Sequence, residues 1–201
     1  MKLPGSASAT LRLSAPAVAL GALLAASGAV SGQQAPAAHP AEVARAEQAM
    51  NTLQQALLTK LRAAMEQGGP AAAVTVCHDE AVVIADRVAR EEHIALGRTS
   101  HRLRNVANAA APWMEPLLAE FLEKPGDRTY RAVRLPDGSI GYVEPIYVRP
   151  VCLSCHGKNI APPVAELLKT SYPQDHAKDF EAGDLRGLYW VKLSPGANAA
   201  K

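Results

Sequence analysis

The spacing of apolar residues predicts helices in the first half of the chain. Between residues 41 and 67, apolar side chains recur at alternating steps of three and four, which places them on one helix face. These positions are Val43, Ala46, Met50, Leu53, Leu57, Leu61 and Met65. The segment Gly68-Gly69-Pro70 is expected to end this helix. A second helix is expected over residues 71–90, and its apolar stripe consists of Cys77, Ala81, Ile84 and Val88.

The second half of the chain contains patterns of both strands and helices. Residues 94–108 mix apolar and basic side chains and are expected to form a strand or loop that lines a pocket. Further helices are expected over residues 112–124 and 162–170. Residues 129–135 and 140–148 alternate like strands around the turn Pro136-Asp137-Gly138, and residues 187–193 form a last strand. These elements predict the α+β class, in which helices precede and flank a small antiparallel sheet.

The first 32 residues have the pattern of an export signal. Lys2 and Arg12 precede and flank an apolar run from Ala15 to Val30, which small residues follow. The run is short for a membrane span, although retention as an N-terminal anchor is the alternative. We therefore expect a signal peptide over residues 1–32, a linker over 33–40, one domain over 41–194 and a tail over 195–201. The mature protein is then periplasmic, without stable insertion in the membrane.

The charge of the chain gives no indication of a nucleic-acid partner. The whole sequence carries 21 basic and 19 acidic residues, and removal of Lys2 and Arg12 with the signal leaves 19 of each. A formally neutral mature chain has no excess of positive charge that would favour nucleic acid or an anionic surface.

The string Cys152-Leu153-Ser154-Cys155-His156 has the CxxCH spacing of covalent haem attachment. Two thiols at this spacing add to the two vinyl groups of haem, and the adjacent imidazole reaches the iron from one face. The alternatives are a redox-active dithiol, which prefers a turn in a βαβ unit, and half of a zinc site, which needs a second ligand pair. Because the string occurs once, we expect a single covalent haem c, with His156 as the proximal ligand of the iron.

The second axial ligand must come from elsewhere in the chain, or the position stays open. The candidates are Cys77, His78, His93, His101, His176, Met50, Met65 and Met114. Cys77 has no disulfide partner once the other two cysteines hold haem, and an inward-facing thiol can supply a thiolate to ferric iron. The alternative for Cys77 is a buried small apolar side chain, and the three methionines are expected in the core.

The two propionates of haem need cations or amide donors. Arg98, Arg102 and Arg104 cluster with Asn105 in a segment suited to bind anions, for which a solvated basic face is the alternative. Asp184 and Arg186 are expected to form an ordinary surface ion pair, or else to orient a propionate partner.

A series of short motifs over residues 41–194 resembles the c-type-haem family with a PAS-like domain. The motifs are Gly69-Pro70, Val76-Cys77, Arg98-Thr99-Ser100, Arg104-Asn105, Asn108, Trp113, Tyr147, Pro150, Cys152 to Gly157, Tyr172-Pro173, Asp175, Ala177, Gly183-Asp184 and Arg186-Gly187. The resemblance implies a PAS-like antiparallel sheet with flanking helices around one haem. It also implies ligation of the iron by the histidine of CxxCH and by a cysteine on an upstream helix, the positions of His156 and Cys77.

Four classes of function are compatible with such a haem. We expect a soluble cytochrome that transfers electrons to or from an unidentified redox partner, in an unknown oligomeric state. The alternative is a redox or gas sensor that acts through a separate partner. An enzyme such as a peroxidase needs an open distal site, which a cysteine ligand would close. A purely structural haem module would have a potential too extreme to cycle.

Overall fold

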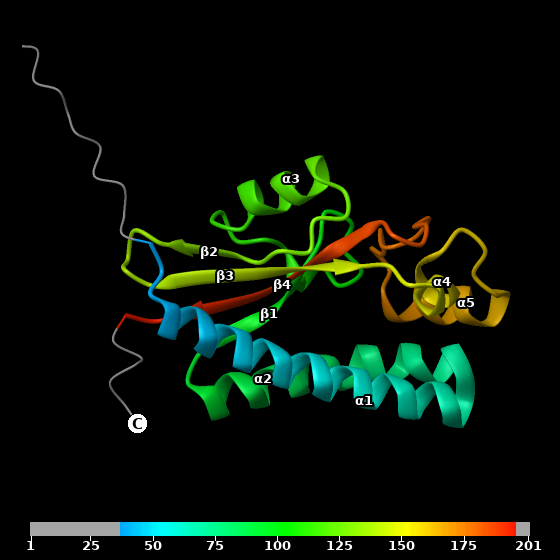
Figure 1. Ribbon diagram of the computed structural model, residues 1–201. Helices are drawn as coiled ribbons and strands as arrows, with labels where there is room; N and C mark the ends of the chain where they lie inside the picture. Colours follow the sequence, from blue (N-terminus) through cyan, green and yellow to red (C-terminus); the bar gives the residue numbers. More distant parts are fainter. Residues whose placement is uncertain (1–36, 196–201) are drawn as a thin grey trace, which may run out of the picture. The chain divides into compact units, whose positions relative to one another are not determined.

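The computed structural model describes residues 37–195, which belong to one compact unit (Figure 1). The predicted signal peptide, the start of the predicted linker and nearly all of the predicted tail lie outside the described residues. The elements are α1 (Pro40–Asp79), α2 (Ala81–Glu92), β1 (Ala95–Thr99), the 3-10 turn η1 (Val106–Asn108), α3 (Glu115–Glu123), β2 (Arg131–Arg134), β3 (Ile140–Tyr147), the 3-10 turn η2 (Pro150–Cys152), α4 (Leu153–His156), α5 (Pro162–Ser171) and β4 (Leu185–Leu193).

The N-terminal helices form a hairpin that turns at two glycines. Gly68 and Gly69 have non-helical backbone angles inside α1, and Gly69 has a φ of 65° that favours glycine. The second limb then returns along the first, so that Lys60 pairs with Glu80 at 2.8 Å. The helix end predicted at this site is therefore confirmed. The second predicted helix is not continuous, because the chain leaves regular helix at Glu80, between α1 and α2.

The four strands form one antiparallel sheet with the order β1-β4-β3-β2. The predicted hairpin is confirmed as β2 and β3, and the last predicted strand begins two residues earlier, at Leu185. The segment predicted as a strand or loop contributes β1, which pairs with β4. The α+β class is confirmed.

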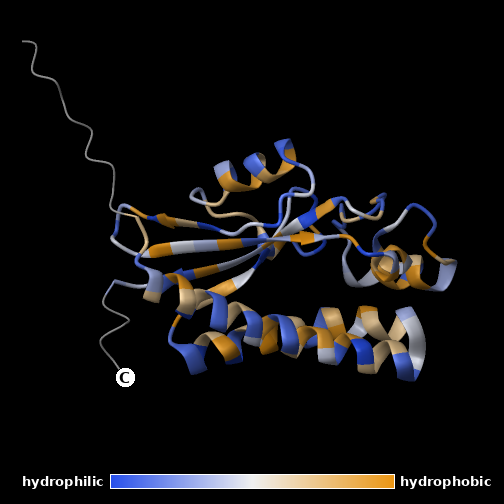
Figure 2. Ribbon diagram, viewed as in Figure 1, coloured by the Kyte–Doolittle hydropathy of each residue, from blue (hydrophilic) through white to orange (hydrophobic). Residues whose placement is uncertain are grey.

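The sheet is covered by helices on both faces (Figure 1). Met50 and Leu53 of α1 and Ile84 and Val88 of α2 pack with residues of β1, β3 and β4, while α3 packs on the opposite face through side chains such as Phe121. Apolar residues recur among more polar ones along β3 and β4, as Figure 2 shows. Because successive side chains point to opposite faces, Tyr142 and Val191 join the core beneath α1 and α2, while Val143 and Leu188 join the core beneath α3.

Helix α3 begins three residues later than its sequence pattern predicts. Pro112 and Trp113 precede the helix, whose first residue is Glu115 and whose N-cap is Met114. Pro116 then occupies the second helical position, where a missing backbone N–H costs no helical hydrogen bond. Among residues 37–195, no helix has both the length and the apolar character needed to cross a membrane.

Replacement of Arg131 by methionine should make the free energy of unfolding depend less on pH in the acidic range. The Arg131 guanidinium binds Glu120 at 2.8 Å and Asp127 at 2.7 Å, and its hydrogen bond, followed by that of Lys124, lowers the pKa of Glu120 to about 2. A carboxyl group with a lowered pKa stabilises the fold above its unfolded pKa of about 4.3, and this contribution disappears as the pH falls toward 2. Urea unfolding at several pH values should therefore show the largest difference between wild type and variant above pH 5, and a difference that grows below pH 4 would contradict this.

Candidate cofactor site at the cysteine pair

The cysteine string lies on one short helical segment that directly follows β3. Residues 150–152 form η2 and residues 153–156 form α4, and the N–H of Gly157 closes the segment on the carbonyl of Leu153 at 2.9 Å. Residues three and four positions apart lie on one side of a helix. Cys152, Cys155 and His156 therefore share one side of the turn, and both thiols are partly exposed.

The imidazole of His156 is held in one tautomer. Its Nδ1 lies 2.8 Å from the carbonyl oxygen of Ala177. Because a carbonyl oxygen only accepts, Nδ1 must carry the hydrogen, and the lone pair remains on Nε2. Burial, with the nearby charges of Arg186 and Arg104, lowers the pKa of His156 to about 2. The ring is therefore neutral at physiological pH and presents Nε2 as a metal ligand.

The backbone around Ala177 is fixed by a buried ion pair. The carboxylate of Asp175 accepts from the N–H of Ala177 at 2.8 Å. Nη2 of Arg104 lies 3.2 Å from this carboxylate, and it also donates to the carbonyl oxygens of Ala177, at 3.1 Å, and of Cys155. The side chains of Arg104 and Asp175 are only 11% and 5% exposed. The pair thus ties the attachment turn to the segment that holds the imidazole.

Cys77 lies at the same end of the molecule as the cysteine pair. Helix α1 contacts α4 and α5, and Val74, one turn before Cys77, is buried in a cluster against which Cys155 also packs. Burial raises the pKa of the Cys155 thiol, and the charge of Cys77 acts in the same direction. Cys77 itself is half-buried. The fold therefore places this third thiol near Cys155.

The other candidates for the second axial position lie in different surroundings. His78 is exposed and pairs with Asp79 at 2.6 Å, while His93 caps the end of α2 in the left-handed conformation. The exposed ring of His101 lies edge-on against Phe180, with 5.9 Å between the ring centroids. His176 is exposed, Met50 and Met114 are buried, and Met65 is half-buried. The core role expected for Met50 is confirmed, because it packs between the helical hairpin and the sheet.

Arg98 and Tyr189 lie on the sheet face that carries the helical hairpin. They pair across β1 and β4, and the core residue Leu96 lies two residues before Arg98 on the same side of its strand. Burial raises the pKa of Tyr189, and Arg98 and Cys152 are among the groups that act on it. Within residues 37–195, no hydrogen bond or ion pair engages the guanidinium of Arg98. The sequence analysis missed Tyr189. Its position two residues before the buried Val191 places both side chains on the same face of β4.

Arg186 is the extra residue of a β-bulge. Ile146 pairs with Gly187 and Tyr147 pairs with Leu185, so Arg186 has no partner on β3. Such bulges aim a side chain away from the regular ladder. Burial, followed by the charges of Arg104 and Arg98, lowers the pKa of Arg186 to about 10. Positive charge is therefore concentrated here, with Asp175 as the carboxylate that offsets it.

The surface ion pair expected between Asp184 and Arg186 is wrong. The carboxylate of Asp184 instead accepts from the N–H of Glu181 at 2.7 Å, while Nη1 of Arg186 donates to the carbonyl of Arg102 at 3.2 Å. The sequence signal for this arrangement was Gly187, because a glycine inside a strand pattern indicates a bulge or a close backbone approach.

Arg102 and Asn105 each have partners within the protein. Nη1 of Arg102 donates to the carbonyl of Lys178 at 2.8 Å, and the guanidinium lies 3.6 Å from the centroid of the Phe180 ring. The side-chain oxygen of Asn105 accepts from the N–H of Ala107 at 3.0 Å and caps η1. Of the predicted anion-binding residues, the structure thus brings Arg98 and Arg104 together with Arg186, and it gives Asn105 a role in the turn.

The two alternatives for the cysteine pair gain no support. The sheet is antiparallel throughout, so the pair does not lie in the βαβ unit that a thioredoxin-like dithiol prefers. Within the described part of the chain, no group of three or more His, Cys, Asp or Glu side chains is arranged to hold a metal ion by itself.

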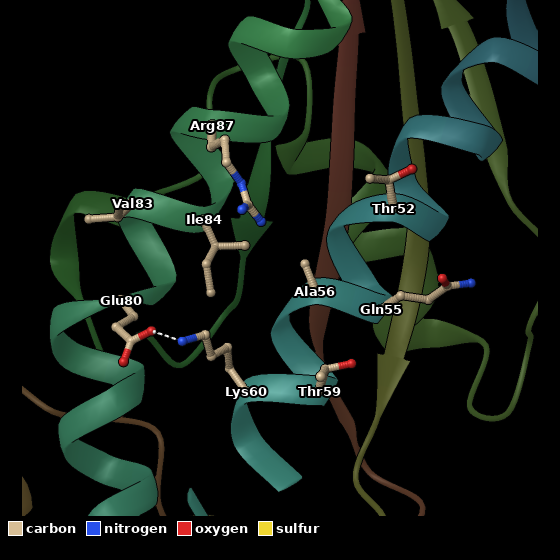
Figure 3. Close-up of a pocket in the computed structure, with 9 residues that line it drawn as sticks. All are labelled: Thr52, Gln55, Ala56, Thr59, Lys60, Glu80, Val83, Ile84 and Arg87. Carbon is tan, nitrogen blue, oxygen red and sulfur yellow. Dashed lines mark ion pairs between the residues drawn. The ribbon is translucent and has the colours of Figure 1, made fainter. Parts of the chain in front are cut away.

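One hollow in the described part of the chain lies away from the thiols. It measures about 580 Å³, lies between α1 and α2, and is crossed by the Lys60–Glu80 ion pair, as Figure 3 shows. Its lining is formed by Thr52, Gln55, Ala56, Thr59, Lys60, Glu80, Val83, Ile84 and Arg87. A second hollow of about 370 Å³ borders the attachment turn at Leu153, Gly157 and Phe180. The candidate site is therefore identified by its thiols, its imidazole and its arginines, and not by the size of a cavity.

Comparisons with known proteins point to one group. The family model described as Tll0287-like matches residues 30–194. Among solved structures, the crystal structure of the cyanobacterial heme-protein Tll0287 is similar, with a TM-score of 0.62 and 22% sequence identity over 79% of this chain and 98% of that chain. At this identity the likeness establishes the fold. The comparison with curated proteins gives no match.

Proposed function

Because the chain belongs to the Tll0287-like family, we propose that it is an exported cytochrome of the c type, which holds one haem and transfers single electrons. The proposal is supported by one observation: Cys152, Cys155 and His156 lie on the same side of one turn, and the Nδ1 hydrogen of His156 is donated to the carbonyl oxygen of Ala177. This geometry leaves two thiols and one free Nε2 lone pair for the same cofactor. The name of the similar structure, a cyanobacterial heme-protein, is consistent with it.

The residues of the site fit a haem through their two thiols and through their positively charged donors. The thiols of Cys152 and Cys155 are partly exposed and share one side of the turn, as the formation of two thioethers requires. The buried Nε of Arg104 has no hydrogen-bond partner among the described residues, and Arg98 also lies close enough to act on the pKa of His156. These donors and the excess of positive charge suit two propionates. When bound, haem supplies an iron that cycles between the ferric and ferrous states.

The chain's own residues then have separate roles. Cys152 and Cys155 would anchor the cofactor, and His156 would bind its iron through Nε2. Ala177 holds the imidazole in the required tautomer. Arg98, Arg186 and the Nε of Arg104 would neutralise the propionates, while Arg102 would lend further positive charge. Cys77 would supply a second ligand to the iron, which its place near Cys155 and the resemblance described above support.

The test of this function is the spectrum and mass of the protein produced from the full chain in cells that attach c-type haem. We expect a periplasmic protein whose mass exceeds that of its amino acids by one haem, and reversible reduction without rapid binding of carbon monoxide. A colourless protein with the mass of the polypeptide alone would refute the proposal. Rapid binding of carbon monoxide to the ferrous protein would instead favour a gas sensor, and turnover of hydrogen peroxide would favour an enzyme.

Replacement of Cys77 by alanine should change the ferric absorption spectrum and raise the reduction potential. A thiolate carries a negative charge that stabilises ferric iron more than ferrous iron, so its loss favours reduction. The measurements are absorption spectra and a redox titration of both proteins. His78→Ala is the matched control on the same helical turn and should leave the spectrum unchanged. Ligation by Cys77 is wrong if the ferric spectra of Cys77→Ala and wild type coincide.

A further inference from the structure

We propose that Arg104 is a positioning residue for His156, and that it raises the reduction potential by weakening the hydrogen bond between the imidazole and Ala177. The inference rests on the proposed function, because it concerns a haem held by His156. It adds to the role expected from the sequence, in which Arg104 was a cation for a propionate. Nη2 of the guanidinium is engaged by the protein itself, while the buried Nε has no hydrogen-bond partner among the described residues.

The carbonyl oxygen of Ala177 receives two donors. The first is the Nδ1 hydrogen of His156 at 2.8 Å, and the second is a hydrogen of Nη2 of Arg104 at 3.1 Å. The other hydrogen of Nη2 points to the carbonyl of Cys155. One nitrogen thus bridges the backbone of the attachment turn and the acceptor that orients the imidazole.

Asp175 holds this arrangement in place. Its Oδ1 accepts from the N–H of Ala177 at 2.8 Å, and its Oδ2 lies 3.2 Å from Nη2 of Arg104. Both side chains of the pair are almost fully buried. Removal of one partner would leave the other as an uncompensated charge inside the protein. The pair must therefore be changed together if the hydrogen bond is to be tested alone.

The sign of the effect follows from the two donors. A partner that accepts the Nδ1 hydrogen of a ligating histidine increases the basicity of the imidazole. A cationic donor on the same carbonyl draws electron density from the oxygen and makes it a weaker acceptor. The imidazole is then less basic toward iron, and the ferrous state is favoured. Loss of Arg104 should therefore strengthen the bond from His156 and lower the potential.

The experiment compares the wild-type holoprotein with the double variant Arg104→Gln, Asp175→Asn. This variant removes one positive and one negative charge, so the net charge of the site is unchanged, and the asparagine side chain would keep an oxygen that accepts from the N–H of Ala177. We expect the equilibrium constant for reduction to fall about tenfold, which is 59 mV for a one-electron couple. The ¹H–¹⁵N resonance of the His156 Nδ1–H in the ferrous protein should move in the direction of a stronger hydrogen bond.

Two further variants make the result decisive. Arg102→Gln removes a positive charge from the same group of arginines but leaves both donors of Ala177 in place, so its Nδ1–H resonance should stay unchanged. Arg104→Lys retains the charge without the fixed fork of the guanidinium, and it replaces the double variant if that protein does not fold. The Nδ1–H resonance should then move as in the double variant, by a smaller amount.

The outcomes separate this inference from the proposed function. A wild-type protein without covalent haem refutes the function itself. A haem-bearing double variant whose potential and Nδ1–H resonance match those of wild type refutes the role of Arg104 alone. An equal displacement of the resonance in Arg102→Gln also refutes it, because the effect would then come from charge and not from the shared carbonyl.

Discussion

Replacement of both Cys152 and Cys155 by alanine will abolish covalent haem attachment while the fold remains intact. The two thiols lie one turn apart on the same side of the segment formed by η2 and α4, and they are the pair that is placed to form two thioether bonds. Both side chains are partly exposed, so alanine at these positions leaves no large cavity in a core. We therefore expect a complete loss of covalently bound haem, and the two substitutions leave no large cavity that would unfold the protein.

Mass spectrometry and haem staining after denaturing electrophoresis measure this result directly. Wild type should retain haem under denaturation, and the double variant should lose it. His156 is still present in the variant, so haem that binds without thioethers would be extracted by denaturation. Cys77→Ala is the control that removes the third thiol, and it should keep covalent haem. Covalent haem in the double variant would mean that attachment occurs elsewhere in the chain.

Replacement of Gly187 by alanine will lower the stability of the fold by about 3 kcal/mol or more. Gly187 has a φ of 155°, and a Cβ built there would collide with the carbonyl oxygen of Thr99. That oxygen belongs to the backbone of β1, which cannot move without breaking its pairing with β4. The same substitution displaces the bulge that carries Arg186.

Gly183→Ala is the matched control for this substitution. Gly183 has a φ of 94°, and a Cβ there would have no neighbour within 4 Å, so the substitution costs backbone strain alone, about 1 to 3 kcal/mol. Urea unfolding of both variants and wild type should show the lower midpoint for Gly187→Ala. Equal midpoints for the two variants would contradict the argument that the backbone of β1 is in the way.

The elements that the sequence predicted well depend on local interactions. The helical stripe that contains Met50 and Leu53 shows which face is buried, and Gly68-Gly69 marks the hairpin turn because these residues tolerate non-helical angles. The sequence was less informative at the start of α3. There Trp113 lies in a preceding turn, and its ring packs against Gly141 of β3, a contact between distant segments.

The candidate site shows the same division. The spacing of Cys152, Cys155 and His156 indicates a shared face as soon as the segment is helical, because positions three and four apart are neighbours on a helix. The sequence favoured a surface ion pair for Arg186 over a place near the propionates, since the direction of its side chain depends on a bulge in the pairing of β3 with β4. The partners of Arg104 were also missed, because Cys155, Asp175 and Ala177 reach it only after the chain has folded.

The amino-acid sequence by itself determined the helices, the hairpin of strands and the string of two cysteines and a histidine, because each depends on residues within a few positions of one another. Only the tertiary structure decided that Cys77 lies near Cys155, that Arg98 and Arg186 gather near this string, and that Ala177 selects the tautomer of His156. These contacts join segments that are far apart in the chain. Their formation depends on the packing of the helical hairpin, the sheet and the loop of residues 172–184 against one another.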